Sequence, residues 1–478
     1  MEEVTEIVNL QIKDRPLRTA LETVSKLVID NGGKALVVGG CVRDAILDRL
    51  SKELDIEVHG ISWDRLVKIL SDCFPIDLVG QSFQVIKIRG LLLDVSIPRR
   101  ESKVGFGHKG FETLGDPDMD PEEALSRRDF TINSMAFDPV SNKLIDPFNG
   151  LQDSKKRILR HTSEKFIEDP LRVLRGMQLV ARFDLHVAPE TVALSHSMSP
   201  EGLPKERIFG EWRELILNGE KPSRGLAFLR ECGWVQYFPE IEALIGCEQD
   251  REWHPEGDVW DHTLVSMDAF ARERVNDDKE DLIVGLAVLC HDLGKPATTK
   301  VEDGRIRSKG HDVAGEAPTR SFLQGLTHQG DLVKEIIPLV SAHLRPREFF
   351  KANVSDSAIR RLAKNVGRID RLVRVAKADA CGSNSGSSDL FQAGEWLLDR
   401  ARILEVENSI PKPIVMGRHL IKIGLIPGLN FEPILSACYN AQMDGEFKEI
   451  EEGMEYAKRL IEKGGNENSD SEKVSVKK

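Results

Sequence analysis

The chain has 478 residues, 40% of them hydrophobic and 30% charged, and its formal net charge is −12. This length is too great for one ordinary core and indicates about three or four structural units, and the composition is that of a water-soluble globular protein. The seven cysteines include no CxxC pair, which excludes a disulfide scaffold. The N-terminal residues are acidic and do not resemble a signal peptide, and no apolar run is long enough to span a bilayer, so we expect a cytoplasmic protein with no membrane partner.

The predicted elements change character near residue 150. Before it, short strands at 36–38 and 85–95 are interspersed with helices around 42–50 and 63–71. After it, the spacing of apolar residues predicts helices at 169–183, 205–217, 222–232, 260–275, 281–292, 331–343, 357–377 and 391–406. We expect an α+β fold with six regions: an N-terminal helical extension (1–34), a mixed head (35–150), a helical neck (151–245), a helical metal-binding domain (246–385), a helical tail region (386–462) and a disordered end (463–478). The Ser/Gly-rich segment 381–389 is predicted to be a linker or loop.

The first strand leads into a Gly39-Gly40 turn and a helix. Glycines lack a Cβ, so a phosphate can approach the backbone there, and the start of a helix offers amide groups and a positive dipole end to an anion. Arg43 could contact the same anion. Such turns also serve packing alone, so this motif is weak evidence by itself.

Three acidic residues alternate along the next predicted strand: Glu53, Asp55 and Glu57. Alternate residues of a strand share one face, and like charges so close together favour either solvation or a bound cation. A pair of carboxylates can hold Mg²⁺, and Asp94 on another apolar strand could supply a third. An exposed, charged edge strand explains the same pattern equally well when these residues are considered alone.

Two arginine-rich motifs follow the carboxylates. Residues 127–133 contain Arg127, Arg128, Asp129 and Asn133. The arginines suit a triphosphate, and Asp129 could accept a hydrogen bond from a ribose hydroxyl. Residues 167–183 contain Asp169, Arg172 and Arg175. Asp followed by Pro is also typical of a helix start, and the arginines could be ordinary surface residues.

Histidine is scarce, yet several histidines recur within the predicted metal-binding domain together with an adjacent His-Asp pair. Imidazole and carboxylate ligands suit a transition metal such as Mn²⁺, Ni²⁺, Co²⁺ or Fe²⁺. A lone histidine is more often a packed core residue, but packing does not explain this pattern. The candidate ligands are His262, His291, Asp292, His311, His343 and Asp379.

Basic residues gather in two places although the net charge is negative. Binding of nucleic acid depends on such clusters more than on net charge. For residues 360–377 we favour an ordinary solvated helix face. The second cluster follows the head and comprises Lys155, Lys156, Arg157, Arg160, Arg172, Arg175 and Arg182.

The ordered motifs GGCVRD, ExDxE, RRDFTIN and EDPLRVLR resemble those of the class II tRNA nucleotidyltransferases, which include CCA-adding enzymes and bacterial poly(A) polymerases. The resemblance implies a head of the DNA polymerase β type followed by helical neck and body regions. It also implies that Asp169 and Arg172 pair with the base edges of incoming CTP and ATP in place of a nucleic-acid template.

The family usually has Asp-x-Asp as its metal pair. Alignment places that pair on Glu53 and Asp55, with Asp94 as the third carboxylate, and an alternative alignment uses Asp55 and Glu57. Asp55 belongs to both alignments. Either set retains two carboxylates for Mg²⁺.

The histidine pattern resembles the HD superfamily of metal-dependent phosphohydrolases. The resemblance implies that His262, His291, Asp292 and Asp379 are primary ligands, and that His311 and His343 complete a second metal site or hold substrate phosphate. The implied chemistry is attack of metal-activated water on phosphorus, with Lys295 able to neutralise the phosphate. Residues 411–447 resemble the C-terminal piece of nucleotidyltransferases that carry an HD domain.

We therefore expect an enzyme that adds CCA to the 3′ end of tRNA from CTP and ATP and that also carries an HD-type phosphohydrolase site. The expected chain is a monomer or a homodimer. An enzyme that adds only C or only A, or that polymerises A, stays open within the same family. A phosphohydrolase whose head merely binds tRNA is the alternative from another class.

Overall fold

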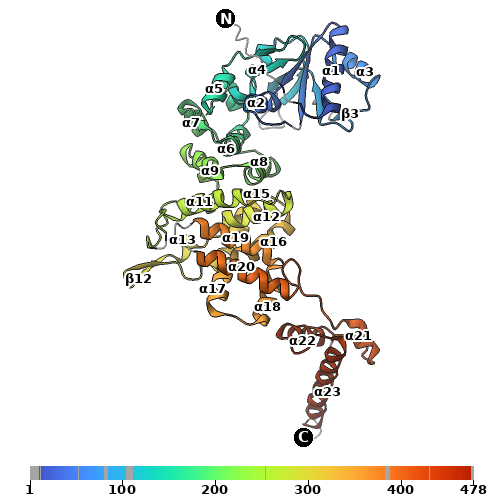
Figure 1. The fold of residues 1–478 in the computed structure, drawn as a ribbon, viewed down its shortest axis with the longest axis vertical. Coiled ribbons are helices and arrows are strands. Elements are labelled where there is room, and N and C mark those ends of the chain that lie inside the picture. The colour runs from blue at the N-terminus through green and yellow to red at the C-terminus, as the bar shows by residue number, and fades with distance from the viewer. Residues whose placement is uncertain are drawn as a thin grey trace. The chain divides into compact units, whose positions relative to one another are not determined.

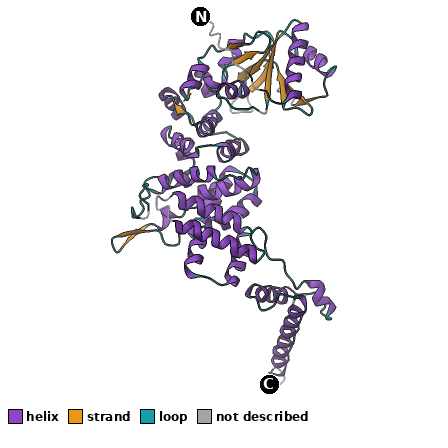
Figure 2. Ribbon diagram, viewed as in Figure 1, coloured by secondary structure: helices purple, strands orange, loops and turns teal. Residues whose placement is uncertain are grey.

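The computed structural model describes residues 10, 12–51, 53–79, 84–103, 111–252, 254–382, 388–429 and 431–474. The chain divides into two compact units, Met1–Pro239 and Glu240–Lys478. The large sheet lies in the first unit, and the second unit is almost entirely helical apart from one short strand pair (Figures 1 and 2). This confirms the predicted α+β fold class.

A seven-stranded mixed sheet forms the head, in the order β3-β4-β5-β2-β1-β8-β9. Its strands are β1 (Lys34–Val38), β2 (Leu54–His59), β3 (Ile76–Val79), β4 (Val85–Ile88), β5 (Leu93–Ser96), β8 (Ala136–Asp138) and β9 (Lys143–Ile145). β2 and β5 run parallel, and the other neighbours run antiparallel. The run at 85–95, predicted as one strand stretch, is two strands, because the chain turns at Gly90 with a φ of 80°.

The two faces of this sheet are covered differently. α1 (Arg15–Asp30) and α3 (Trp63–Ser71) bury their apolar sides against one face, together with Ile56 and Val58 of β2. The predicted N-terminal extension is thus part of the head. Side chains alternate along β2, so Asp55 and Glu57 lie on the opposite face, which also carries Val38.

The rest of the first unit is helical apart from short strand pairs. Its elements are α2 (Gly40–Ile46), β6 (Arg99–Lys103), β7 (Phe111–Gly115), α4 (Pro121–Ser126), α5 (Gly150–Lys156), β10 (Ile158–Leu159), α6 (Leu171–Phe183), β11 (His186–Val187), α7 (Pro189–His196), α8 (Lys205–Asn218) and α9 (Pro222–Glu231), with α10 (Pro239–Glu242) at the boundary. α6 packs against α8 and α9. A Cβ at Gly225 would overlap the carbonyl of Met177, so this crossing requires glycine. The predicted helices in this region are confirmed to within two residues, whereas α2 is shorter than predicted.

The second unit is built around α12 (Asp278–Cys290). Every residue from Leu282 to Cys290 is buried, because other helices pack on all of its sides. The surrounding elements are α11 (Val259–Arg272), α13 (Lys295–Thr298), β12 (Lys300–Glu302), β13 (Arg305–Arg307), α14 (His311–Ala314), α15 (Glu316–Leu326), α16 (Gly330–Ser341), α17 (Arg345–Ala352), α18 (Asp356–Val366), α19 (Ile369–Gly382) and α20 (Ser388–Ile403). The single helix predicted for 357–377 is wrong, because the chain breaks at Gly367 with a φ of 75°.

The C-terminal elements are α21 (Gly417–Lys422), α22 (Phe431–Asp444) and α23 (Ile450–Val474). α23 continues through residues 463–474, which belong to the end of the chain predicted to be disordered. Residues 475–478, and 383–387 of the predicted linker, lie outside the described residues. In the described part of the chain, no helix combines the length and the apolar character needed to cross a membrane.

The basic segment 360–377 is not merely a solvated helix face. Arg371 is 6% exposed, and its guanidinium lies 2.7 Å from Glu280 and 2.6 Å from Glu335. Arg374 pairs with Asp281. These ion pairs join α19 to the start of α12 and to α16. The sequence-based interpretation was therefore wrong at these positions, since charge pairing between distant helices leaves no periodic signal.

Replacing Arg371 by methionine is expected to lower the free energy of unfolding by about 2 kcal/mol, because two carboxylates lose their shortest ion pair with a largely buried arginine and keep only the longer contacts of Arg368 and Lys279. Thermal unfolding of the full chain would measure this loss. Arg361→Met is the control, since Arg361 pairs with Asp444 while 60% exposed, and such pairs contribute about 0–1 kcal/mol. An equal effect of both variants would contradict the prediction.

Candidate active site of the head and candidate metal centre

Asp55 and Asp94 are neighbours in the sheet. They are direct partners in the register of the parallel strands β2 and β5. Desolvation raises the pKa of Asp55, the charge of Arg128 opposes this, and the charges of Asp94 and Glu53 raise it further. Mutually repelling carboxylates of this kind suit a divalent cation, which would relieve the repulsion. The donor set therefore fits Mg²⁺.

Glu57 lies on the same face but is already engaged. Its carboxylate is 3.2 Å from His59 Nε2 and 4.0 Å from Arg128. Burial alone would raise the pKa of Glu57, but the nearby His59 and the charge of Arg128 outweigh it and lower the pKa. The geometry thus favours Asp55 with Asp94 and Glu53 over a pair of Asp55 with Glu57.

The glycine turn brings an arginine to the carboxylates. Gly39 has a φ of 80°, and a Cβ there would lie 2.9 Å from Arg128 Nη1 and 3.6 Å from Asp55 Oδ2. Gly40 follows as the first residue of α2. The absence of a side chain at Gly39 therefore leaves the space in which Arg128 and Asp55 meet.

Arg43 and Asn133 support the site from inside. Arg43 is 6% exposed, and it donates to Asp44 Oδ1 at 2.6 Å and to Asn133 Oδ1 at 2.7 Å. Asn133 donates to Asp129 Oδ1 at 2.9 Å, and Asp129 Oδ2 pairs with Arg175 at 2.9 Å. This chain of bonds, which is buried except at Arg175, joins α2 to α6. It holds Arg43 away from the surface where the sequence had predicted an anion contact.

Asp169 and Arg172 lie where the neck meets the head. Asp169 Oδ1 accepts from the amide of Leu171 at 3.0 Å, as the helix-start interpretation predicted, and Asp169 Oδ2 pairs with Arg207 of α8 at 2.8 Å. Arg172 donates to the carbonyls of Lys165 and Arg127, each at 2.7 Å. These bonds fix both side chains at the start of α6. Sequence reasoning missed Arg207, which only tertiary packing brings to Asp169.

The histidines of the second unit share one arrangement of their rings. His291, His311 and His343 donate from Nδ1 to the backbone carbonyl three residues earlier, at 2.7, 2.8 and 2.7 Å. His262 Nδ1 instead bonds Glu256 Oε1 at 2.8 Å. A carbonyl or carboxylate oxygen only accepts, so each Nδ1 carries the proton. Each neutral ring therefore presents the Nε2 lone pair.

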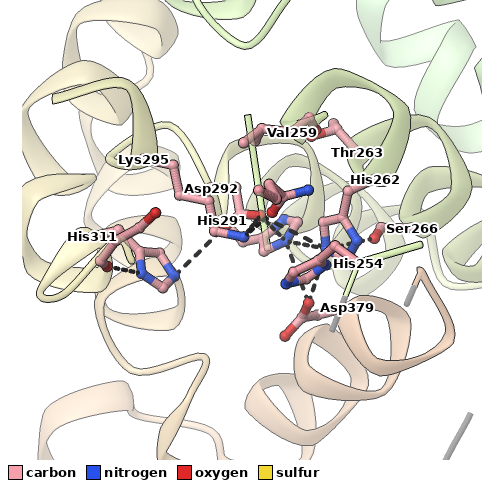
Figure 3. A network of polar contacts seen from close by, with 12 residues as sticks. His254, Val259, His262, Thr263, Ser266, His291, Asp292, Lys295, His311 and Asp379 are labelled. Atoms are coloured by element: carbon pink, nitrogen blue, oxygen red, sulfur yellow. Dashed lines mark hydrogen bonds and ion pairs between the residues drawn. The ribbon is translucent and has the colours of Figure 1, made fainter. Parts of the chain in front are cut away.

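The Nε2 atoms of His262, His291 and His311 approach Asp292 (Figure 3). His343 belongs to the same group, because ligand atoms of Asp292, His311 and His343 lie within 4.8 Å of one another. His262 Nε2 lies 3.2 Å from His291 Nε2, and His311 Nε2 lies 3.3 Å from His343 Nε2. Lone pairs facing each other at this distance need a cation or a proton between them. Asp292 Oδ2 is 3.2 Å from His291, and its Oδ1 is 3.3 Å from His311. One carboxylate thus lies between two histidine pairs.

The carboxylates of the centre favour a positive charge on its histidines. Burial lowers the pKa of His291, but the charges of Asp292 and Asp379 outweigh it and raise the pKa to about 10. Asp379 Oδ1 also lies 3.0 Å from His262 Nε2. A metal would replace the proton that these carboxylates otherwise hold on the ring. The structure thus brings all six predicted ligands together, and the donor set fits a transition metal.

A cavity of about 370 Å³ opens on this centre. Asp292, His311, His343 and Asp379 line it together with Lys295, whose Nζ lies 2.7 Å from Asp292 and 2.6 Å from Gln249 Oε1. Sequence reasoning missed several residues near or in this cavity. These residues are Gln249, His254, Glu256, Arg347 and Lys351. The sequence offered a signal for one of them, because His254 is a second histidine eight positions before the candidate ligand His262.

Comparison with known families identifies two matched regions. The family described as "Poly A polymerase head domain" matches residues 35–160, and "Probable RNA and SrmB- binding site of polymerase A" matches residues 184–245. The first covers the carboxylates and the arginine motif of the head. The second covers the helices that follow α6.

Comparison with curated proteins gives close relatives of the same kind. The chain is 34% identical over 371 residues to a multifunctional CCA protein of Laribacter hongkongensis, covering 75% of this chain and 87% of the relative. It is 41% identical over 273 residues to that of Nitrosococcus oceani, covering 56% and 64%.

Solved structures share the fold. A Bacillus stearothermophilus CCA-adding enzyme in complex with CTP aligns with a TM-score of 0.65 at 23% identity, over 95% of this chain and all of that one. A Thermotoga maritima CCA-adding enzyme complexed with tRNA aligns with a TM-score of 0.60 at 19% identity, over 96% and 100%.

Proposed function

This chain belongs to the class II tRNA nucleotidyltransferase family and is a nucleotidyltransferase, and on that premise we propose that it adds CCA to the 3′ end of tRNA from CTP and ATP without a nucleic-acid template. The observation that carries the proposal is the register of Asp55 with Asp94 beside Glu53, on the face that Arg128 reaches. The names of the curated relatives support CCA as the added sequence.

In the proposed reaction the terminal hydroxyl of tRNA attacks the α-phosphorus of the nucleotide, a new P–O bond forms, and the bond to pyrophosphate breaks. Glu53, Asp55 and Asp94 would hold Mg²⁺, which when bound activates the hydroxyl and stabilises the departing pyrophosphate. Arg128 lies beside Asp55 and is placed to neutralise the triphosphate. The hydrogen bonds among Arg43, Asn133 and Asp129 stabilise the backbone below this surface.

Nucleotide choice is assigned to Asp169 and Arg172. Asp169→Ala is expected to lower the preference for CTP and ATP over UTP and GTP by about 10–100-fold, because each lost base contact is worth about 1–3 kcal/mol of discrimination. Competition between single nucleotides on one tRNA would measure it. Glu168→Gln is the control in the neighbouring position. Unchanged selectivity in Asp169→Ala would contradict the assignment.

The function is tested with tRNAs that end before CCA, after C and after CC, each given one nucleotide at a time. We expect CTP to extend the first two and ATP to extend the third. Incorporation of only C, only A, or runs of A would identify the specialised alternatives. Failure to incorporate CTP or ATP into any of these tRNAs would sink the proposal.

A second activity is favoured by the histidine centre: a metal-dependent phosphohydrolase acting on 2′,3′-cyclic or 2′-phosphate groups. His262, His291, Asp292 and Asp379 would hold a transition metal such as Ni²⁺, Mn²⁺ or Co²⁺, with His311 and His343 completing a second site or holding phosphate. Such a metal supplies activated water for attack on phosphorus. Lys295 lines the cavity and is placed to neutralise the phosphate. Phosphate release from these substrates with Ni²⁺ or Mn²⁺ tests it.

A further inference from the structure

Glu256 contacts two histidines at once. We infer that it is a positioning residue that aims His262 at the metal and His254 at the cavity through a single carboxylate oxygen. The inference deepens the proposed phosphohydrolase and rests on its metal centre. Neither Glu256 nor His254 is among the six predicted metal ligands.

The geometry of the contact determines which ring nitrogen of each histidine carries the proton. Glu256 Oε1 lies 2.8 Å from His262 Nδ1 and 2.8 Å from His254 Nδ1. A carboxylate only accepts, so both Nδ1 atoms carry protons and both Nε2 atoms carry lone pairs. A carboxylate that orients a metal-binding histidine fixes its tautomer and its ring, and makes it a better ligand.

His262 depends on this carboxylate more than the other ligands depend on any side chain. His291, His311 and His343 use backbone carbonyls as Nδ1 partners. His262 is fully buried, so water cannot replace Glu256 as its acceptor. Among these four histidines, His262 is therefore the one whose ring loses its Nδ1 hydrogen-bond acceptor when a single supporting side chain is substituted.

The local backbone explains why Glu256 lies there. Asp258 caps α11, accepting from the amide of Asp261 at 2.9 Å through Oδ1 and from that of Gly246 at 2.6 Å through Oδ2. Gly257 has a φ of 135°, and a Cβ there would overlap the carboxylate of Asp261. The cap and the glycine turn together bring Glu256 beside the first turn of α11, where His262 lies.

His254, Glu256 and His262 are close enough to suggest a metal site of their own. The distances argue against it. The 2.8 Å contacts of Glu256 are those of charge-assisted hydrogen bonds, and His262 Nε2 already faces His291 at 3.2 Å and Asp379 at 3.0 Å. A metal on His262 Nδ1 would compete with the proton that this bond requires. Glu256 therefore supports a metal ligand through a hydrogen bond and is not itself a ligand.

His254 extends the same arrangement into the cavity. Its ring lies edge-to-face on that of His262, with centroids 4.9 Å apart, and it lines the cavity with Lys295. With Nδ1 tied to Glu256, its Nε2 is the atom left to meet a substrate. We assign His254 to substrate binding and not to the metal.

The test is metal affinity, measured on the full chain by competition with a chelator for Ni²⁺ and for Mn²⁺. Glu256→Gln keeps the size of the side chain but loses its charge, and we expect affinity to fall by about 10–100-fold. Glu252→Gln, four positions earlier and with its side chain 63% exposed, is the matched control and should not change affinity. CCA addition should persist in both variants, because the head site lies in the other compact unit, and thermal unfolding of the full chain reports whether the unit that carries Glu256 folds.

His254→Gln separates the two halves of the inference, since it should retain metal affinity while hydrolysis falls. A glutamine oxygen still accepts from both rings, so wild-type affinity in both Glu256→Gln and Glu256→Ala, which removes the acceptor, would overturn the positioning role. A loss of metal in His254→Gln equal to that in His262→Ala would make His254 a ligand and overturn its assignment. If the wild-type chain binds neither metal, the proposed centre fails and this inference fails with it; if it binds metal but hydrolyses nothing, only the proposed activity fails.

Discussion

Asp55→Asn is expected to reduce nucleotide incorporation by at least about 10³-fold. The carboxylate pairs with Asp94 across β2 and β5 and belongs to both possible metal pairs. Its loss removes transition-state stabilisation of several kcal/mol, and about 4 kcal/mol corresponds to this factor. Single-turnover addition of CTP to a tRNA lacking CCA would measure the effect.

The same substitution should not harm the fold. Burial raises the pKa of Asp55 most, and repulsion from Asp94 and Glu53 raises it further, although the charge of Arg128 opposes both. Removing one of these charges relieves that repulsion, so the melting temperature of Asp55→Asn without Mg²⁺ should equal or exceed that of the wild type. Asp64→Asn on α3, against the other face of the sheet, is the control and should keep activity. Normal incorporation in Asp55→Asn would refute the assigned site.

Asp292→Asn is expected to abolish phosphate release and to weaken Ni²⁺ or Mn²⁺ binding by more than about 100-fold. Its two oxygens lie between the pairs His262/His291 and His311/His343. Loss of a supporting residue typically costs about 10–100-fold in affinity, so loss of a ligand that serves both pairs should cost more. Chelator competition and release of phosphate from a 2′,3′-cyclic substrate are the measurements.

CCA addition should survive Asp292→Asn, because the head site lies in the other compact unit. Asp303→Asn in the turn between β12 and β13 is the control; Asp303 has a φ of 52°, which asparagine tolerates. The opposite outcome, in which Asp292→Asn abolishes all activity and Asp55→Asn abolishes none, would favour a phosphohydrolase whose head merely binds tRNA.

Helices and candidate residues were largely predictable because their signals are local. The apolar spacing of 205–217 and 222–232 predicted α8 and α9 closely, since a helix repeats every 3.6 residues along its own sequence. The predicted residues of the histidine centre likewise meet in the structure. Errors arose where one residue changes the backbone: Gly90 divides a predicted strand run, and Gly367 divides a predicted helix.

The motifs alone were enough to identify the carboxylates, arginines and histidines as candidate site residues, and to predict that Asp55 is central to the head. Only the tertiary structure decided which of them meet. The register of β2 with β5 pairs Asp55 with Asp94, and packing of α11 on α19 brings His262 to a residue 117 positions away. Tertiary packing also buries Arg43 and brings Glu256 into hydrogen-bond contact with His262. The physical reason is that sheet register and helix packing depend on contacts between distant segments, which leave no periodic pattern in either segment.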